Sequence, residues 1–230
     1  SVVTPITKYA AVVRDTSEIR WQLEKAWYLA TTGRPGPVWL DIPLDVQAAE
    51  IINPGALTAF HAEAPVPFDR ETVTSVFERL RTAQRPVIIA GYGVRLASAL
   101  PTFHRVIEQL KVPVLTTISG VDLLPTDHPY FYGRPGLLGE RAANFIMQNA
   151  DLVIILGTRM SLRILSYAYQ TFAREAYRVM VDIDAGELQK PTLKIDLPIC
   201  MDAGDFLSEL HQLGELPAKN AWLDYCSDKK

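Results

Sequence analysis

The chain has 230 residues, of which 23 are Lys or Arg and 26 are Asp or Glu, so its formal net charge is −3. Hydrophobic residues make up 48 % and charged residues 21 %, as in an ordinary soluble globular protein. The length exceeds that of a typical domain, so we expect one complete domain and an additional piece. The near-neutral charge, without a run of five like charges, argues against nucleic acid or an anionic membrane surface as the main partner.

The apolar stretches and the cysteines exclude a membrane-spanning protein and a protein stabilised by disulfides or by a four-cysteine zinc site. The longest apolar runs, such as 152–156, have the length of a strand and fall far short of the ~20 residues that span a membrane. Cys200 and Cys226 form no CxxC pair, which excludes a disulfide framework and a four-cysteine zinc site. Two reduced thiols are typical of a cytosolic protein, and we expect a cytoplasmic location.

Residues 1–50 contain one predicted helix and one predicted strand. Apolar side chains recur every three or four residues over 19–30, which predicts an amphipathic helix, and Gly33 follows where a helix end favours positive φ. Residues 38–42 form a short apolar strand. One helix and one strand do not make a domain, so we expect this piece to belong to a larger sheet and to pack poorly by itself. The chain starts at Ser1 rather than Met, and we expect it to be a fragment.

The remaining residues read as a linker, a complete domain and a second linker. Residues 51–68 contain three prolines and one glycine and show little periodicity. Over 69–213, apolar strands alternate with amphipathic helices, which predicts an α/β fold with a doubly wound parallel sheet covered on both faces. The predicted strands are 86–90, 112–116, 152–156, 177–181 and 197–201. The polar tail, 214–230, predicts another linker.

Ligands of such sheets bind outside the carboxyl ends of the strands, so the residues there are the candidate site. Gly91 and Gly93 follow the first strand and either let a phosphate approach the backbone or only permit a tight turn. Arg159 and Arg163 follow the third strand, after Gly157. They either bind an anionic group or pair with nearby carboxylates.

The aspartates at the later strand ends also allow two interpretations. Asp182 could accept hydrogen bonds from a ribose, or Asp184 could only cap the following helix, and Asp202 leaves the same choice. Leu96 stands at the third glycine position of a GxGxxG fingerprint, and no acidic residue ends the second strand. Both differences argue against a simple NAD-dependent dehydrogenase.

The sequence shows no equipment for acid–base or nucleophilic catalysis. The four histidines, His61, His104, His128 and His211, are scattered, and none lies beside a plausible nucleophile or at metal-ligand spacing. No GxSxG elbow and no GxxxxGK[ST] phosphate loop occurs. We therefore expect no catalysis by this chain alone.

Several sequence blocks follow one another along the chain: ATTGRPGPVWLDIPLDV at 30–46, RPVIIAG at 85–91, VPVLTT at 112–117, DHP at 127–129, GLLG at 136–139, ADLVIILGTR at 150–159 and VDID at 181–184. Together they resemble thiamine-diphosphate enzymes of the acetolactate synthase (large subunit) type. The first block resembles the end of the pyrimidine-binding domain of these enzymes, and the other blocks resemble their central domain. The resemblance implies a six-stranded, Rossmann-like central domain over 69–213, after the C-terminal piece of a pyrimidine-binding domain over 1–50 and a linker over 51–68. The tail, 214–230, then leads toward a missing diphosphate-binding domain.

The resemblance implies a parent enzyme, a transferase that decarboxylates a 2-keto acid such as pyruvate and ligates the product to a second carbonyl. Such enzymes activate thiamine diphosphate with a glutamate early in the pyrimidine-binding domain, and they hold it through Mg²⁺ at a Gly-Asp-Gly motif that this sequence lacks. The chain is therefore expected to be a non-catalytic central domain, inactive by itself. Its implied partners are the missing pyrimidine- and diphosphate-binding domains, in a homo-oligomer.

The resemblance also implies a cofactor site in this chain, because acetolactate synthases bind FAD in the central domain. The implied contacts lie at the strand ends and in the GLLG turn; no catalytic residue or metal ligand is implied. They are Gly91, Gly93, Thr116, Thr117, Leu138, Gly157, Arg159, Arg163, Asp182, Ile183, Asp202 and Ala203.

Three alternatives remain open at this stage. The turn lacks the histidine of the family's Gly-Met-His-Gly, and Ser161 stands where the family has an acid, so a flavin-free thiamine-diphosphate decarboxylase domain is one alternative. Another is an autonomous Rossmann-like nucleotide-binding enzyme, such as a sirtuin-type deacylase, although these usually carry a four-cysteine zinc cluster. The third is a structural domain without a ligand.

Overall fold

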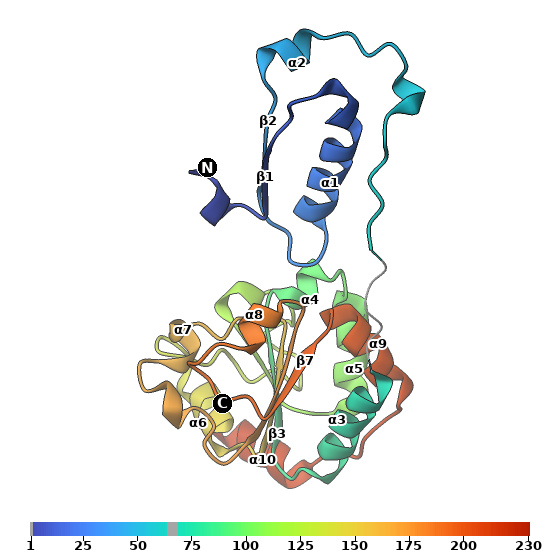
Figure 1. The fold of residues 1–230 in the computed structure, drawn as a ribbon. Helices are drawn as coiled ribbons and strands as arrows, with labels where there is room; N and C mark the ends of the chain where they lie inside the picture. The colour runs from blue at the N-terminus through green and yellow to red at the C-terminus, as the bar shows by residue number, and fades with distance from the viewer. Residues whose placement is uncertain (1, 64–68) are drawn as a thin grey trace. The chain divides into compact units, whose positions relative to one another are not determined.

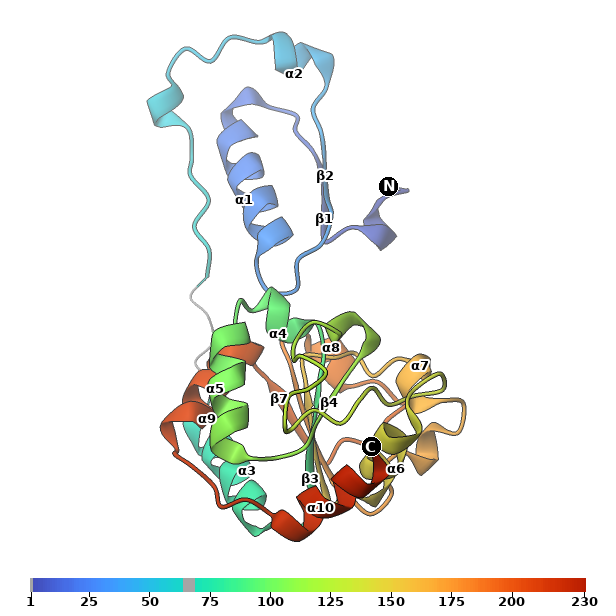
Figure 2. The ribbon, with the colours of Figure 1, turned by 180° about the vertical axis from the view of Figure 1, so that it is seen from behind.

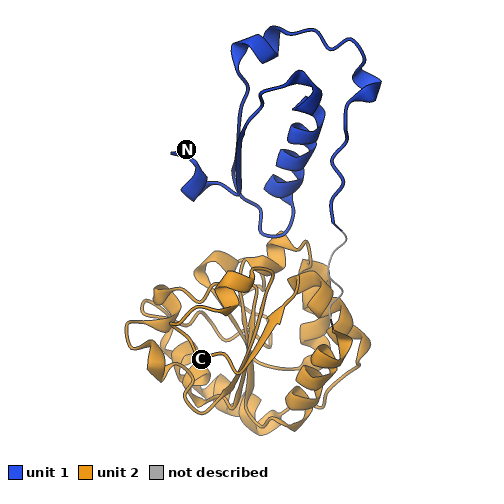
Figure 3. Ribbon diagram, viewed as in Figure 1, with its two compact units in different colours: residues 1–67 blue, residues 68–230 orange. Residues whose placement is uncertain are grey.

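The computed structural model describes residues 2–63 and 69–230. The chain forms two compact units, an N-terminal unit of residues 1–67 and a C-terminal unit of residues 68–230 (Figure 3). The boundary between them falls at the end of the predicted linker, part of which lies outside the described residues. No described helix is both long and apolar enough to cross a membrane.

The N-terminal unit is a helix on a two-stranded parallel sheet. Its elements are β1 Tyr9–Val12, α1 Ile19–Thr31, β2 Val38–Asp41 and α2 Leu44–Ala48, with 3-10 turns at Thr4–Ile6, Thr16–Glu18 and Pro54–Ala56. Tyr9 lies opposite Val38 in the sheet, and its hydroxyl donates to Gln22 Oε1 of α1 at 2.6 Å. The predicted helix and strand are present, and Gly33 after α1 has φ +60°. The sequence did not indicate β1, because its short Tyr-Ala-Ala-Val run lacks alternation.

The C-terminal unit alternates strands with helices throughout. Its elements are α3 Arg70–Thr82, β3 Pro86–Ala90, α4 Gly93–Leu96, α5 Leu100–Leu110, β4 Val114–Thr116, α6 Arg141–Asn149, β5 Leu152–Leu156, α7 Leu162–Leu165, β6 Tyr177–Asp182, α8 Ala185–Leu188, β7 Leu197–Cys200, α9 Ala203–Gln212 and α10 Asn220–Lys229. Short 3-10 turns lie at Ile118–Gly120 and Tyr169–Thr171. All five predicted strands are present.

These strands form one parallel sheet in the order β4-β3-β5-β6-β7. The helices α3, α5 and α9 cover one face, and α6, α7 and α10 supply apolar side chains to the core on the other (Figures 1 and 2). β3 and β5 are buried along their whole length, which explains their continuous apolar sequences. The doubly wound α/β fold is thus confirmed.

The sixth strand that the family resemblance implies is not formed as a strand in the described part of the chain. Beside β4, at the end of the strand order, Phe131 makes an isolated parallel bridge to Val114. Tyr132 N also donates to Val114 O at 3.0 Å, but Gly133, with φ +96°, turns the chain immediately afterwards. The turn limits this segment to a short extension of the sheet edge.

The tail also differs from the linker that the sequence predicts. Residues 220–229 form α10, whose Trp222 is only 4 % exposed and donates from Nε1 to Pro86 O at 3.0 Å. Cys226, one turn later, is fully buried in the same core. Trp222 and Cys226 form an apolar stripe at i, i+4 spacing, too short to stand out among the polar residues around it.

Candidate functional site

The strand order places a topological switch point between the neighbouring strands β3 and β5. The chain connects β3 to β4 on one side and β5 to β6 on the other, so the connections that leave the carboxyl ends of β3 and β5 run in opposite directions. Gly91 N donates to Leu156 O at 2.9 Å, and Gly93 N donates to Gly157 O at 2.8 Å. These bonds join the loops that follow β3 and β5, at the position where sheets of this kind bind ligands.

The glycines at this switch point serve a close approach between two backbones. A Cβ on Gly93 would lie 2.5 Å from the Cα of Gly157, and one on Gly91 would lie 2.5 Å from Gly157 O. Gly157 itself has φ +58°, which favours glycine. The chain's own backbone therefore fills the space at these glycines, and the tight-turn interpretation is the one that the contacts support.

Thr116 is the last residue of β4, and Thr117 follows it; both are buried. Thr117 is 6 % exposed, and its N–H donates to Ala90 O at 3.0 Å. Thr116 is fully buried, and its Oγ1 has no hydrogen-bond partner among the described residues. By strand alternation it shares a face with Val114, on the side covered by α5. The structure therefore places these two side chains in the interior next to the switch point.

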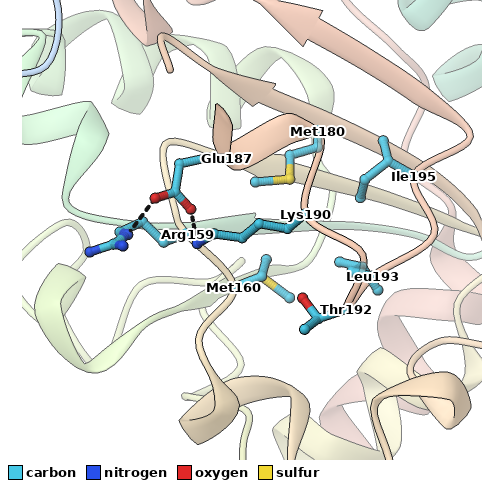
Figure 4. Close-up of a pocket in the computed structure, with 8 residues that line it drawn as sticks. All are labelled: Arg159, Met160, Met180, Glu187, Lys190, Thr192, Leu193 and Ile195. Carbon is cyan, nitrogen blue, oxygen red and sulfur yellow. Dashed lines mark hydrogen bonds and ion pairs between the residues drawn. The ribbon is translucent and has the colours of Figure 1, made fainter. Parts of the chain in front are cut away.

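Arg159 takes part in a cluster of charges that the sequence did not reveal. Its Nε donates to Glu187 Oε1 at 2.7 Å, and Lys190 Nζ contacts the other carboxylate oxygen (Figure 4). The Glu187 side chain is only 5 % exposed, whereas that of Arg159 is 60 % exposed. The ion-pair interpretation thus holds for Arg159, with its guanidinium still open to solvent.

Glu187 escaped the sequence prediction because its spacing has a more ordinary explanation. Asp184 and Glu187 stand three residues apart at the start of α8, the spacing of a capping box. Asp184 does cap α8, accepting from Gly186 N at 2.9 Å. The carboxylate of Glu187, however, turns to Arg159 and Lys190, beside a small pocket (Figure 4). The pocket is lined by Arg159, Met160, Met180, Glu187, Lys190, Thr192, Leu193 and Ile195.

Arg163 and Leu138 lie in two segments that pack together. The backbone oxygen of Arg163 accepts from Leu137 N at 2.8 Å, which ties α7 to the GLLG turn at 136–139. Arg163 is exposed and has no ion-pair partner within the described part of the chain. Leu138 is 89 % exposed. Both side chains are thus available to a ligand.

The aspartates at the later strand ends cap local backbone. Asp182 Oδ1 accepts from Asp184 N at 3.0 Å, and Asp202 Oδ1 accepts from Gly204 N at 2.7 Å at the start of α9. Ala203 is buried and Ile183 is 38 % exposed. The capping interpretation is therefore the one that the structure supports for Asp184 and Asp202.

Exposed apolar side chains surround these strand-end loops. They come from the segments after β3, β4, β5 and β6 and from the GLLG turn, and are Tyr92, Leu96, Ile118, Val121, Leu137, Leu138, Leu162 and Ile183. Apolar surface combined with exposed arginines suits a flat molecule that carries a negative charge, such as a nucleotide. We call this region, with Arg159 and Arg163, the strand-end surface.

The described residues contain no group of three His, Cys, Asp or Glu that could hold a metal ion. His104 Nε2 contacts Leu123 O at 2.7 Å, and His128 Nε2 lies 3.1 Å from Glu108 Oε1, both within structural contacts. Burial raises the pKa of the Cys226 thiol to about 12, so it stays protonated at neutral pH and is a poor nucleophile.

Comparison with known proteins gives a consistent pattern. Residues 73–210 match the family model described as "Thiamine pyrophosphate enzyme, central domain". The acetolactate synthase large subunit of Lactococcus lactis subsp. lactis is 35 % identical over 100 % of this chain and 40 % of its own length. The isozyme 1 large subunit of Escherichia coli K12 is 36 % identical over 97 % of this chain and 39 % of its own length. Glyoxylate carboligase of Escherichia coli O157:H7 is 31 % identical over 100 % of this chain and 40 % of its own length. The chain thus spans about 40 % of the length of the curated relatives that it matches.

Proposed function

The chain belongs to the thiamine pyrophosphate enzyme family, whose central domain it contains, and we propose that it is part of an enzyme of the acetolactate synthase type. The observation that carries this proposal is the agreement between the family match over 73–210 and alignments to acetolactate synthase large subunits that extend over almost the whole chain. The doubly wound C-terminal unit agrees with that assignment.

The reaction that we propose for the whole enzyme is the decarboxylation of a 2-keto acid and the ligation of the product to a second carbonyl. Thiamine diphosphate, with Mg²⁺, supplies the carbanion chemistry when bound. We propose that both are held mainly by domains other than those in this chain, because the described residues hold no metal-ligand cluster. The same reasoning predicts that the chain alone forms no acetolactate from pyruvate. A cytoplasmic homo-oligomer is part of this proposal.

For the chain itself we propose a structural role together with FAD binding at the strand-end surface. Arg159 and Arg163 would contact the diphosphate, and exposed side chains such as Tyr92, Leu138 and Ile183 would contact the rings. At Gly91 and Gly93, the backbone of Gly157 already fills the space that a side chain would occupy. The alternative is a flavin-free decarboxylase or carboligase domain, which the internal partners of Arg159 and Asp202 would equally suit.

A flavin titration of the purified chain tests this proposal. We expect saturable quenching of FAD fluorescence that weakens about tenfold in Arg163→Ala, because one charge-assisted contact is lost. Arg174→Ala is the matched control, since Arg174 is also exposed but lies before the amino end of β6. Absence of saturable binding would favour the flavin-free alternative. Binding of thiamine diphosphate with Mg²⁺ in a parallel titration would contradict the assignment of that site to other domains.

A further inference from the structure

In the cluster of Arg159, Glu187 and Lys190, the exposed guanidinium of Arg159 pairs with the buried carboxylate of Glu187. Glu187 lies in α8, and its side chain is 5 % exposed, against 60 % for Arg159 and 35 % for Lys190. A buried carboxylate is costly unless it is paired, and here both of its oxygens face a cation. The carboxylate is thus paired with a cation on two sides.

The contact to Glu187 uses one edge of the Arg159 guanidinium. Nε donates to Glu187 at 2.7 Å, and the two terminal nitrogens make no hydrogen bond to other described residues. Those nitrogens form the fork that binds phosphate and carboxylate groups in a bidentate way. Two cations share one carboxylate in this cluster, so a positive charge remains for a ligand.

The backbone around Arg159 is also fixed. Gly157 has φ +58° and Met160 has φ +45°, so left-handed residues stand on both sides of the arginine. A methionine in that region is strained by about 1–2 kcal/mol, a cost that recurs at functional sites. The side chain of Met160 is buried, 4 % exposed, in the same core cluster as Met180 and Leu193.

From these observations we infer that Glu187 is a positioning residue that fixes Arg159 to bind an oxyanion, a phosphate group of a nucleotide, at the strand-end surface. Lys190 neutralises Glu187 from the other side, so that Glu187 does not cancel the charge of Arg159. This inference rests on the proposed nucleotide site, but it concerns the residue that organises the site. A cluster with a structural role alone would stabilise the fold and leave ligand affinity unchanged.

A double-mutant cycle with two probes, FAD and inorganic pyrophosphate, tests the inference. We expect Glu187→Gln to weaken the binding of both probes about tenfold, because a neutral amide fixes the orientation of the guanidinium less firmly than the carboxylate does. In the Arg159→Ala background, the same change should have almost no further effect on binding. Glu78→Gln is the control, because Glu78 makes a comparable contact with Arg81, Nε to Oε2 at 2.8 Å, on α3.

Two further measurements keep the test independent of folding defects and of the probes. Arg159→Lys changes an exposed side chain and keeps its charge; it should bind both probes as weakly as Glu187→Gln. In ¹H–¹⁵N spectra, the Nε–H signal of Arg159 is assigned by its loss in Arg159→Lys; we expect it to exchange slowly with solvent in the unaltered chain and fast in Glu187→Gln. A fast-exchanging Arg159 signal in the unaltered chain would overturn the inference.

The outcomes separate this inference from the flavin proposal. If pyrophosphate binds and is weakened in Glu187→Gln but not further weakened in the Arg159→Ala background, while FAD does not bind, the inference is retained and the proposal of FAD binding is rejected. FAD binding that is equal in all variants would retain the flavin and overturn the inference. If neither probe binds the unaltered chain, both are rejected, whereas the family assignment is unaffected.

Discussion

Gly93 and Gly157 show how single residues determine the geometry of the strand-end surface. The two loops approach until a Cβ on Gly93 would lie 2.5 Å from the Cα of Gly157, and that neighbour is backbone that cannot rotate away. We predict that Gly93→Ala lowers the free energy of unfolding by about 2–3 kcal/mol, in the range of other overpacking substitutions. Urea denaturation followed by circular dichroism measures the change.

Gly214→Ala is the comparison for this prediction. Gly214 has φ +101° but nothing within 4 Å of an added Cβ, so its substitution introduces backbone strain without a clash. It should cost about 1–2 kcal/mol. If Gly93→Ala costs no more than this, the close approach of the two loops is not a constraint on the fold.

The two cysteines differ in their exposure to solvent, and we expect their reactivity toward thiol reagents to differ in the same way. Cys226 is buried and its pKa is raised to about 12 by burial, whereas Cys200 is exposed. At pH 8 we expect a thiol reagent to modify Cys200 at once and Cys226 only after unfolding, as mass spectrometry would show. Fast modification of both in the folded protein would contradict the packing of α10.

The same thiol makes stability depend on pH. Its folded pKa of about 12 lies above the value of 9.0 expected without burial, so the unfolded chain loses its proton first as the pH rises. The contribution of Cys226 to stability is therefore complete below about pH 9 and decreases toward pH 12. Cys226→Ala should flatten this part of the stability curve, and an unchanged slope would assign the loss to other groups.

At the level of elements, sequence patterns were informative where burial is continuous or periodic. The strands of the C-terminal unit were predicted to within one or two residues, because runs such as 152–156 are buried on both faces. α10 was missed because its stripe is one turn long, and β1 because it is four residues long. The contact between Arg159 and Glu187 joins residues 28 positions apart, and no local pattern encodes such a pairing.

We predict that α10 contributes strongly to the stability of the C-terminal unit. Trp222 packs in the same core cluster as the buried side chains of α6, and its Nε1 donates to the backbone oxygen of Pro86, the first residue of β3. Lys219 Nζ donates to Arg81 O at 2.8 Å. We expect Trp222→Ala to destabilise the C-terminal unit by about 3–5 kcal/mol, through the lost contacts and the lost hydrogen bond. Lys219→Ala, which removes an exposed contact, should cost less than about 1 kcal/mol. If both substitutions lower the free energy of unfolding by the same small amount, residues 214–230 are only a linker.

At the scale of the whole molecule, the two units differ in how their sheets are covered. Strands of the C-terminal unit lie between two layers of helices. In the described part of the N-terminal unit, α1 packs on one face of a two-stranded parallel sheet, and Trp39 of β2 is 53 % exposed. Parallel sheets are normally covered on both faces, and two strands are only marginally stable in water. The two units are therefore expected to differ strongly in stability.

Hydrogen exchange measures this difference directly. We expect the amides of Val38–Asp41 to be protected at least about 100-fold less than those of Leu152–Leu156, because local opening of the small sheet breaks few contacts. β7, which ends the strand order of the large sheet, is the control for edge position and should remain protected. Equal protection of β2 and β5 in a monomer would show that one helix suffices to stabilise the small sheet. The expected difference instead supports the proposal that this sheet is completed by further strands in the whole enzyme, with the C-terminal unit as the part of the chain that folds independently.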